Sequence, residues 1–393
     1  MKRRDLDKLL SHILSLHPKG LSDLNFTSFR AIQAEIRGSL SAIPAVPELA
    51  FGYLSPFQIA RVARRIIDTD LRALKQLHAS GSADLSYAIP EVMRFRVNIF
   101  RSQGLLSIVL RKLESQIPRL EELKSPLIFR EIAKEPNGLI LVTGATGSGK
   151  STTLAAMLRQ INEERAIHII SLEDPIEYVH TNMKATFNQR EQGKDFDTFP
   201  NGLRAALRQA PKIIHVGEMR DRTTMEIGLS AAETGHLVIS TLHTVDAGQT
   251  ISRIIGMFDK DEEQQIRIRL ASTLRWVICQ RLVVDSDGNR LAVYEIMGNN
   301  LRTNELILKG EDERKTFADV IEASEPLGWQ TFENYLVCLY REGRISEETA
   351  LANTTRRSLM RQKIDRVKGS KGEQTSTMGE LTIDVNYPKR LKP

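Results

Sequence analysis

The sequence contains few cysteines and no long apolar run. Only Cys279 and Cys338 occur among its 393 residues, far apart and each in an apolar context that suggests a helix. Two isolated cysteines support neither a disulfide framework nor a cysteine-rich zinc site, so we expect two buried thiols in a cytosolic protein. No run of about 18 apolar residues could span a bilayer, and the basic N-terminus lacks the apolar segment of a signal peptide. We therefore expect a cytoplasmic protein without a transmembrane segment.

A strong excess of one charge is also missing. The formal net charge is +6, and the apolar content of 41% and charged content of 26% are ordinary for a globular protein. This mild basic balance is compatible with nucleic acid or an inner-leaflet membrane surface as a partner, but it establishes neither. A length of 393 residues exceeds the usual size of one domain, so we expect at least two.

The first third of the chain mixes helical and strand patterns. Apolar residues at helical spacing predict an amphipathic helix over residues 6–14 and a further helical segment from residue 55 to about 77. Alternating residues predict strands at 83–89, 95–101 and 105–111. These elements indicate a small α+β domain, and residues 118–126, bounded by prolines, form the natural linker after it.

From residue 127 onward, apolar β-branched runs alternate with helical patterns. We expect strands at 139–143, 167–172, 213–216, 237–241 and 291–296. This alternation favours an α/β fold with a mostly parallel, helix-covered sheet, whose ligand lies at the carboxyl ends of the strands. Helices are then predicted at 301–309, 317–323, 329–341 and 346–353, and a poorly ordered tail from about residue 369.

A glycine-rich motif, G-x-x-x-x-G-K-[ST], occupies residues 144–151 between a predicted strand and a predicted helix. In that context the loop N–H groups and the helix N-terminus converge on one point and favour phosphate oxygens there. Lys150 would neutralise the β- and γ-phosphates, and the Ser151 hydroxyl would ligate Mg²⁺. The alternative is a flexible turn before a helix. The candidate nucleotide-binding residues are Gly144, Ala145, Thr146, Gly147, Ser148, Gly149, Lys150, Ser151 and Thr152.

Two later strands end in carboxylates. The strand at 167–172 leads into Glu173-Asp174-Pro175-Ile176-Glu177, where Glu177 could orient the water that attacks the γ-phosphate. A solvated acidic turn is the alternative. The run at 213–217 precedes Glu218, the position of a Walker B acid that holds Mg²⁺ directly or through water. His215 inside this run suggests a packed core residue rather than a ligand.

Two histidines bracket the strand at 237–241. His243 follows the strand, where it could hydrogen-bond a γ-phosphate oxygen or the water-positioning glutamate and so sense whether ATP or ADP is bound. His236 precedes the strand, and the sequence favours a structural and a functional role for it equally.

Four ordered motifs carry a resemblance to a known family. The segments 144–153, 173–180 (EDPIEYVH), 216–221 (VGEMRD) and 231–244 (AAETGHLVISTLHT) resemble the Walker A, Asp box, Walker B and His box of the secretion ATPases. Together with 188–191 and 203–208 they most resemble the type IV pilus retraction ATPases of the PilT/PilU kind, in the type II/IV secretion ATPase superfamily. The resemblance covers roughly residues 50 to 350.

The resemblance implies a fold and an assembly. It implies a RecA-like P-loop core at 127–299, an N-terminal PAS-like α+β domain at 1–117, a linker at 118–126, C-terminal helices at 300–367 and a basic tail at 368–393. Family members are hexameric rings that hydrolyse ATP with Mg²⁺ and depolymerise pilin fibres from the cytoplasmic side of the inner membrane. The implied partners are a homohexamer, an inner-membrane platform protein and paralogous pilus ATPases, without nucleic acid.

The resemblance also implies roles for single residues. Glu177 corresponds to the catalytic glutamate and Glu218 to the Walker B acid, while His236 and His243 form the His box and Lys150 is the Walker A lysine. The candidate arginines that reach nucleotide across a subunit interface are Arg94, Arg96 and Arg111, and Arg253 matches another recurrent arginine.

Other functions stay open at this point. A pilus-assembly or type II secretion ATPase is the nearest rival, although such enzymes commonly carry a tetracysteine zinc module that this chain cannot build. VirB11-type and conjugative ATPases match less closely. A non-hydrolysing paralogue that binds ATP and serves another motor is supported by Lys212, where the family is usually acidic, and by the long tail. Nucleic-acid translocation is supported by the basic charge alone.

Overall fold

The chain forms two compact units. The structure, a computed structural model, describes residues 2–16, 20–36, 38–43, 52–90, 92–113, 116–313 and 315–372. The first unit comprises Met1–Val142, Lys150–Leu242 and Ile254–Arg275, and the second comprises Thr143–Gly149, His243–Arg253 and Trp276–Pro393. The predicted domain boundaries were drawn from sequence patterns rather than from compactness, and they stay a prediction.

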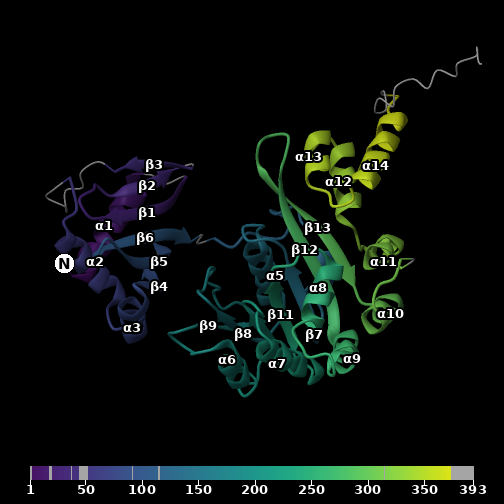
Figure 1. Cartoon of the computed structure of the whole chain (residues 1–393), viewed down its shortest axis with the longest axis horizontal. Coiled ribbons are helices and arrows are strands. Elements are labelled where there is room, and N and C mark those ends of the chain that lie inside the picture. Colours follow the sequence, from purple (N-terminus) through teal and green to yellow (C-terminus); the bar gives the residue numbers. More distant parts are fainter. Residues whose placement is uncertain are drawn as a thin grey trace, which may run out of the picture. The chain divides into compact units, whose positions relative to one another are not determined.

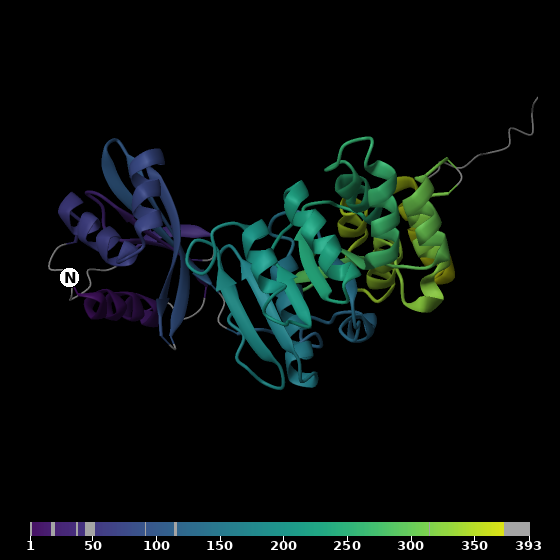
Figure 2. The same ribbon diagram turned by 90° about the horizontal axis from the view of Figure 1, so that it is seen from below.

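The amino-terminal part of the first unit is built on a six-stranded antiparallel sheet with the order β3-β2-β1-β6-β5-β4 (Figure 1; Figure 2 shows the same ribbon turned by 90°). Its elements are α1 (Arg3–Leu16), β1 (Leu21–Thr27), β2 (Gln33–Ile36), β3 (Ser39–Ala42), α2 (Pro56–Ile67), α3 (Leu71–Ser80), β4 (Ser82–Ile89), β5 (Met93–Ser102) and β6 (Leu105–Leu113). The apolar stripe of α1 and alternate strand residues share one core cluster, whose buried members all lie between residues 6 and 110. The helix predicted at 6–14 and the three predicted strands are present, the single helical segment predicted from 55 to about 77 is divided into α2 and α3, and β1 to β3 were not predicted.

The remainder of the first unit carries parallel strands in the order β7-β11-β10-β8-β9. Its strands are β7 (Gly138–Thr143), β8 (His168–Glu173), β9 (Thr186–Glu191), β10 (Ile213–Val216) and β11 (Leu237–Leu242), and its helices are α4 (Ile128–Ile132), α5 (Lys150–Glu164), α6 (Phe199–Ala206), α7 (Arg222–Glu233) and α9 (Glu263–Thr273). β8 pairs in parallel with both β9 and β10, and β10 pairs in parallel with β11. The carboxyl ends of these four strands therefore meet at one edge. The α/β fold predicted from the sequence is confirmed, although β9 was not predicted.

The second unit is organised around an antiparallel hairpin and a set of helices. Its elements are α8 (Ala247–Ile255), β12 (Leu274–Val284), β13 (Arg290–Gly298), α10 (Leu301–Lys309), α11 (Phe317–Ala323), the 3₁₀ turn η1 (Glu325–Leu327), α12 (Phe332–Arg341), α13 (Glu347–Ala352) and α14 (Arg357–Ser370). β12 pairs with β13 from Trp276 opposite Gly298 to Val284 opposite Arg290. The four helices predicted after residue 299 are all present.

Three expectations need correction. Cys279 lies in the strand β12 and not in a helix. The apolar run around it, Val277-Ile278-Cys279, is too short to distinguish the period of a strand from that of a helix. Cys279 is buried as expected, whereas Cys338 on α12 is only partly buried. Residues 369 and 370 still belong to α14, residues 371 and 372 form a turn after it, and residues 373–393 of the tail predicted to be poorly ordered lie outside the described residues.

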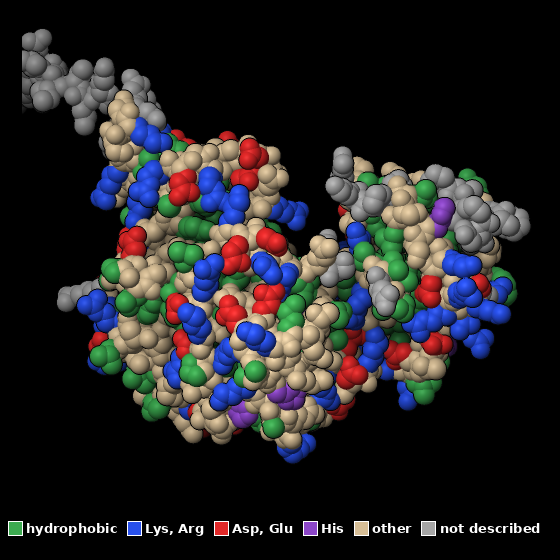
Figure 3. Space-filling model, turned by 180° about the vertical axis from the view of Figure 1, so that it is seen from behind, with side chains coloured by type: hydrophobic (Ala, Val, Ile, Leu, Met, Phe, Trp, Pro, Cys, Tyr) green, Lys and Arg blue, Asp and Glu red, His purple; other side chains and the backbone are tan. Residues whose placement is uncertain are grey.

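The surface mixes charges of both signs. On the face shown in Figure 3, Lys and Arg side chains are interspersed with Asp and Glu, in keeping with a net charge of only +6. Among the residues that the structure describes, no helix has the length and apolar character needed to cross a membrane.

His215 occupies the buried strand β10, where its side chain is 6% exposed. Burial lowers the pKa of this imidazole to about 3, so the side chain is neutral in the folded protein at physiological pH. This burial agrees with the core role expected from the sequence.

This histidine should make the free energy of unfolding depend on pH. Between its ordinary pKa and about 3, the unfolded chain binds a proton that the folded chain does not, so stability falls as the pH falls through that window. At pH 5 the loss relative to pH 8 is about 2 kcal/mol. Urea unfolding should show a shallower pH dependence for His215→Gln, while the exposed control His78→Gln keeps the wild-type slope. Equal slopes for His215→Gln and the wild type would contradict a neutral buried imidazole.

Candidate nucleotide site

The glycine-rich loop adopts backbone angles that only glycine tolerates. In the second unit, Gly144 has a φ of +146° and Gly149 a φ of +85°. A Cβ added to Gly144 would lie 2.3 Å from the backbone oxygen of Gln280, and one on Gly149 would lie 2.9 Å from the Gln280 Nε2 atom. The close approach of the β12 backbone therefore requires glycine at position 144, and the positive φ angle favours glycine at both positions.

The loop also buries a polar atom without a partner. The Ser148 hydroxyl oxygen is inaccessible to solvent and forms no hydrogen bond among the described residues. The Ser148 N–H donates to the Ala145 carbonyl at 3.2 Å, which closes the turn. Buried hydroxyls normally find a partner, so an unpaired one inside a glycine-rich loop suits a bound anion such as phosphate.

Three candidate residues of the first unit lie together. Lys150 begins α5 and is only 9% exposed. Burial lowers the pKa of its ammonium group, while the nearby carboxylates of Glu177 and Glu218 act in the opposite direction. The structure thus brings a cation and the two predicted acids into one electrostatic neighbourhood. Ser151 and Thr152 follow on the same helix, and the Thr152 hydroxyl lies 2.9 Å from the Tyr178 hydroxyl.

The loop that carries Glu177 is supported from β9. The Gln189 amide donates to Glu173 Oε1 at 2.9 Å and to the Tyr178 carbonyl at 2.7 Å, and its oxygen accepts from the His180 N–H. Burial raises the pKa of Glu173 to about 7, although hydrogen bonds from Ser171 and Gln189 oppose that rise. One glutamine side chain therefore holds both ends of the segment that contains Glu177.

Glu191 is a site residue whose individual role was not predicted. It lies opposite Glu173 in the parallel β8–β9 register, and its Oε2 accepts from the Ile176 N–H at 3.3 Å, next to Glu177. The same carboxylate accepts from the Ser86 hydroxyl at 2.8 Å and from Arg94 at 2.9 Å. Burial alone would raise its pKa, but Lys194, Ser86 and Arg94 hold that pKa below the usual value. The available signal was the segment 188–191, which contributed only to the family resemblance, whereas the pairing of Glu191 with Glu173 depends on β9, which was not predicted.

The four candidate arginines lie in different surroundings. Arg94 is paired with Glu191, and Arg111 is paired with Asp23 at 2.8 Å. Arg96 lies near Asp174, where it and Arg72 oppose the rise in the pKa of Asp174 caused by burial. Arg253 is exposed on α8 of the second unit. Arg94 therefore reaches the acidic loop through Glu191, and Arg96 lies near Asp174 of that loop.

The two histidines occupy opposite ends of β11. The His236 ring nitrogen Nδ1 lies 3.1 Å from the Ala231 carbonyl, at the amino end of the strand. Because β10 and β11 are parallel, this end lies away from Glu218, which follows the carboxyl end of β10. The structure therefore does not bring His236 to Glu177 and Glu218. His243 follows the carboxyl end of β11 and is exposed in the second unit.

Glu218 and its neighbour form a charged turn after β10. The Glu218 carboxylate pairs with the Arg220 guanidinium. Asp221 accepts from the Thr224 N–H at 2.9 Å and caps α7, which fixes the turn from its far side. Among the described residues, no group of three or more His, Cys, Asp or Glu side chains could hold a metal ion by itself.

Comparison with known proteins assigns this chain to a family. Residues 75–330 match the family described as type II/IV secretion system protein. The chain is 44% identical to the type IV pilus retractation ATPase PilT of Pseudomonas aeruginosa over 342 residues, which cover 87% of this chain and 96% of the relative. It is 36% identical to the type IV pilus ATPase PilU of the same bacterium over 383 residues, with 97% of each chain covered.

A solved structure agrees with these relatives. The crystal structure of the pilus retraction motor PilT with bound ADP superposes with a TM-score of 0.79 at 36% identity, covering 90% of this chain and 97% of that one. The sequence-based resemblance is thus confirmed over nearly the whole length of the relatives. The chain belongs to the type II/IV secretion ATPases and is a PilT/PilU-like member of that family.

Proposed function

We propose that this protein is a hexameric, Mg²⁺-dependent ATPase motor that couples ATP hydrolysis to retraction of a type IV pilus. The observation that carries the proposal is the cluster of Lys150, Glu177 and Glu218, on a chain similar over 87% of its length to a retraction ATPase. The PilT relative from Pseudomonas aeruginosa and the PilT of the solved structure are both named for retraction, and that structure contains ADP.

In the proposed reaction, each group has a separate task. The N–H groups of residues 144–149 and the N-terminus of α5 bind the phosphate oxygens, and Lys150 neutralises the charge on the β- and γ-phosphates. Glu177 orients the attacking water and accepts its proton, while Gln189 and Glu191 hold the loop in which Glu177 lies. His243 contacts the γ-phosphate end of the site and distinguishes ATP from ADP.

The residues present suit Mg²⁺ bound together with the nucleotide. Mg²⁺ prefers hard oxygen ligands and is usually held by one or two protein groups together with phosphates and water. The Ser151 hydroxyl and the Glu218 carboxylate are such groups, and a larger protein-only cluster is missing among the described residues. When bound there, Mg²⁺ would supply charge neutralisation at the phosphates.

The assembly belongs to the same proposal. A hexameric ring at the cytoplasmic side of the inner membrane would dock on a platform protein at the pilus base, and candidate arginines would complete each site from the neighbouring subunit. Paralogous pilus ATPases are candidate partners, because PilT and PilU relatives both occur in one bacterium. Similarity to PilU over 97% of the chain also supports the alternative of an accessory subunit. Assembly and type II secretion ATPases are the other rivals.

Replacing Glu177 by Gln should separate hydrolysis from binding. We expect kcat to fall by about 10²- to 10⁴-fold, because the amide cannot accept the proton of the attacking water. The affinity for ATP should stay within a few-fold, since the phosphate loop is untouched. Phosphate release measures the first quantity and fluorescent-nucleotide titration the second.

A matched control for that variant is Glu348→Gln, which changes an acid in the first turn of α13 of the second unit. Near wild-type turnover by Glu177→Gln would refute the assigned role. Intact ATP binding without turnover by the wild-type protein would favour the accessory-subunit alternative.

A methyl group at Gly144 should prevent nucleotide binding. Alanine at this position would clash with the Gln280 backbone oxygen and would be strained at a φ of +146°. We expect the affinities for ATP and ADP to fall at least about tenfold, since the loop backbone must shift to accommodate the methyl group. Gly369→Ala, on α14 with open space around it, is the control that should bind normally. Unchanged binding by Gly144→Ala would place the nucleotide elsewhere.

The direction of force needs a cellular test. Deletion of the gene should leave cells hyperpiliated but unable to move on surfaces if the motor retracts pili. Loss of pili would instead identify an assembly ATPase and overturn the proposed retraction.

A further inference from the structure

The residues that follow His243 are bonded to the β12–β13 hairpin at two points, Val245 and Ala247. The Arg281 guanidinium donates from Nη2 to the Val245 carbonyl at 3.3 Å, and Glu295 Oε1 accepts from the Ala247 N–H at 2.9 Å. Arg281 and Glu295 lie on one face of the hairpin, because Glu295 is directly opposite Cys279, two residues before Arg281. Asp246 lies between these anchors and caps α8 by accepting from the Gln249 N–H at 2.7 Å.

Arg281 reaches a second backbone segment with its other nitrogen. Its Nη1 donates to the Asn353 carbonyl at 2.7 Å, and the guanidinium lies over the Phe332 ring with its carbon 4.0 Å from the ring centroid. The Arg281 guanidinium thus joins the residues after His243 to the end of α13 while it stacks on the Phe332 ring of α12. The planar fork of arginine can do both at once, whereas a lysine ammonium is a point charge without that geometry.

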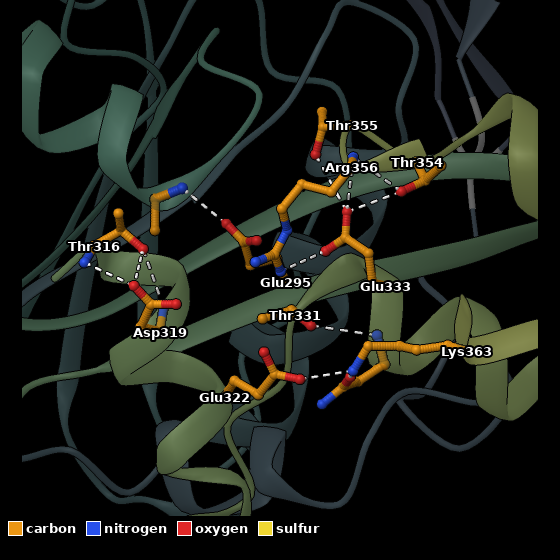
Figure 4. A network of polar contacts seen from close by, with 12 residues as sticks. Glu295, Thr316, Asp319, Glu322, Thr331, Glu333, Thr354, Thr355, Arg356 and Lys363 are labelled. Carbon is orange, nitrogen blue, oxygen red and sulfur yellow. Dashed lines mark hydrogen bonds and ion pairs between the residues drawn. The ribbon is translucent and has the colours of Figure 1, made fainter. Parts of the chain in front are cut away.

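The anchor at Asn353 is itself rigid. Glu333, adjacent to Phe332 on α12, is 1% exposed and accepts from the Thr354 hydroxyl at 2.9 Å and from Arg356 Nη2 at 2.8 Å (Figure 4). It also accepts from the Thr355 hydroxyl and from the Arg356 N–H, both at 3.3 Å. A buried carboxylate with this many donors fixes the connection between α13 and α14. The Asn353 carbonyl is therefore a firm support for Arg281.

The charges around Arg281 are balanced within the same network. Burial raises the pKa of Glu295 to about 7, and the charges of Asp246 and Glu333 act in the same direction while Arg281 opposes them. Removing Arg281 would take away the cation that opposes the rise in the pKa of the buried Glu295, which is costly, whereas Glu333 would keep its ion pair with Arg356. A purely structural role for Arg281 would therefore appear as lost stability, and the test must separate stability from turnover.

We propose that Arg281 is a positioning residue that sets the place of His243 by joining the Val245 carbonyl to the Asn353 carbonyl. The inference rests on the proposed function, in which His243 serves ATP hydrolysis at the phosphate end of the nucleotide. A small displacement of a catalytic group can cost up to about 10²-fold in rate, so the support of this segment matters to kcat.

Arg281→Lys in the full-length protein tests the proposal. We expect kcat to fall about tenfold, because lysine keeps the positive charge but cannot bond both carbonyls in the same geometry. KM for ATP and the affinity for ADP should stay within twofold, since the glycine-rich loop and Lys150 are unchanged. Arg290→Ala, an exposed arginine of the same hairpin, is the matched control and should keep the wild-type kcat.

Comparison with Arg281→Ala separates positioning from stability. Lysine should restore most of the melting temperature lost in the alanine variant, because the cation stays beside the acidic side chains and over Phe332. It should not restore kcat. If kcat and the melting temperature recover together in Arg281→Lys, the residue is structural and the proposal is wrong.

A double-mutant cycle with His243 identifies the route of the effect. In a His243→Ala background, Arg281→Lys should change kcat by less than about twofold, because the group that Arg281 positions is already gone. A full tenfold loss in that background would overturn the proposal while leaving the function of His243 intact. If His243→Ala alone has wild-type kcat, the role of His243 in the proposed function fails, and that failure is visible without Arg281.

Discussion

The parallel pairing of β8, β9, β10 and β11 is the constraint on which the candidate site depends. Parallel strands end at the same edge, so side chains that are distant in the chain become neighbours there. Glu173 faces Glu191 across the β8–β9 pair, and Glu218 follows the end of β10 on the other side of β8. The parallel direction of the strands therefore brings the candidate residues together, whatever the chemistry of their side chains.

Crowding acids at one edge has an electrostatic cost, and the structure offsets it with hydrogen bonds and cations. Gln189 bonds the Glu173 carboxylate, while Arg94, Lys194 and Ser86 surround Glu191. Lys150 lies near Glu177 and Glu218, which oppose the loss of its proton on burial. A nucleotide with its metal ion would meet a region in which charges of both signs are already held in place, so little reorganisation would accompany binding.

In the second unit, an antiparallel hairpin supports the loops that carry the candidate residues. β12 approaches the glycine-rich loop so closely that Gly144 has no space for a side chain, and the next residue along β12 after Gln280, Arg281, bonds the segment after His243. One strand therefore supports both the phosphate-binding loop and the His243 segment. Glu333 and Arg356 extend this support to the C-terminal helices, which links those helices to the same backbone.

The sequence by itself determined the phosphate loop, the acidic residues at strand ends, the order of the motifs and the family. These signals are local, because a glycine spacing, an apolar run and the residue that follows it lie within a few positions of one another. The strands β7, β8, β10, β11 and β13 were predictable for the same reason. β12, which contains Cys279, was harder to predict, since its apolar runs are short and are interrupted by Gln280 and Arg281, so they carry no clear period.

Only the tertiary structure decided which partners support those residues. The contact between Glu191 and the Ile176 N–H depends on the β8–β9 register, and a shift of one residue would turn the carboxylate to the other face. The bonds from Arg281 to Val245 and Asn353 join segments far apart in the chain, as does the pairing of Arg94 with Glu191. Such contacts are set by packing and strand register, which no local pattern encodes.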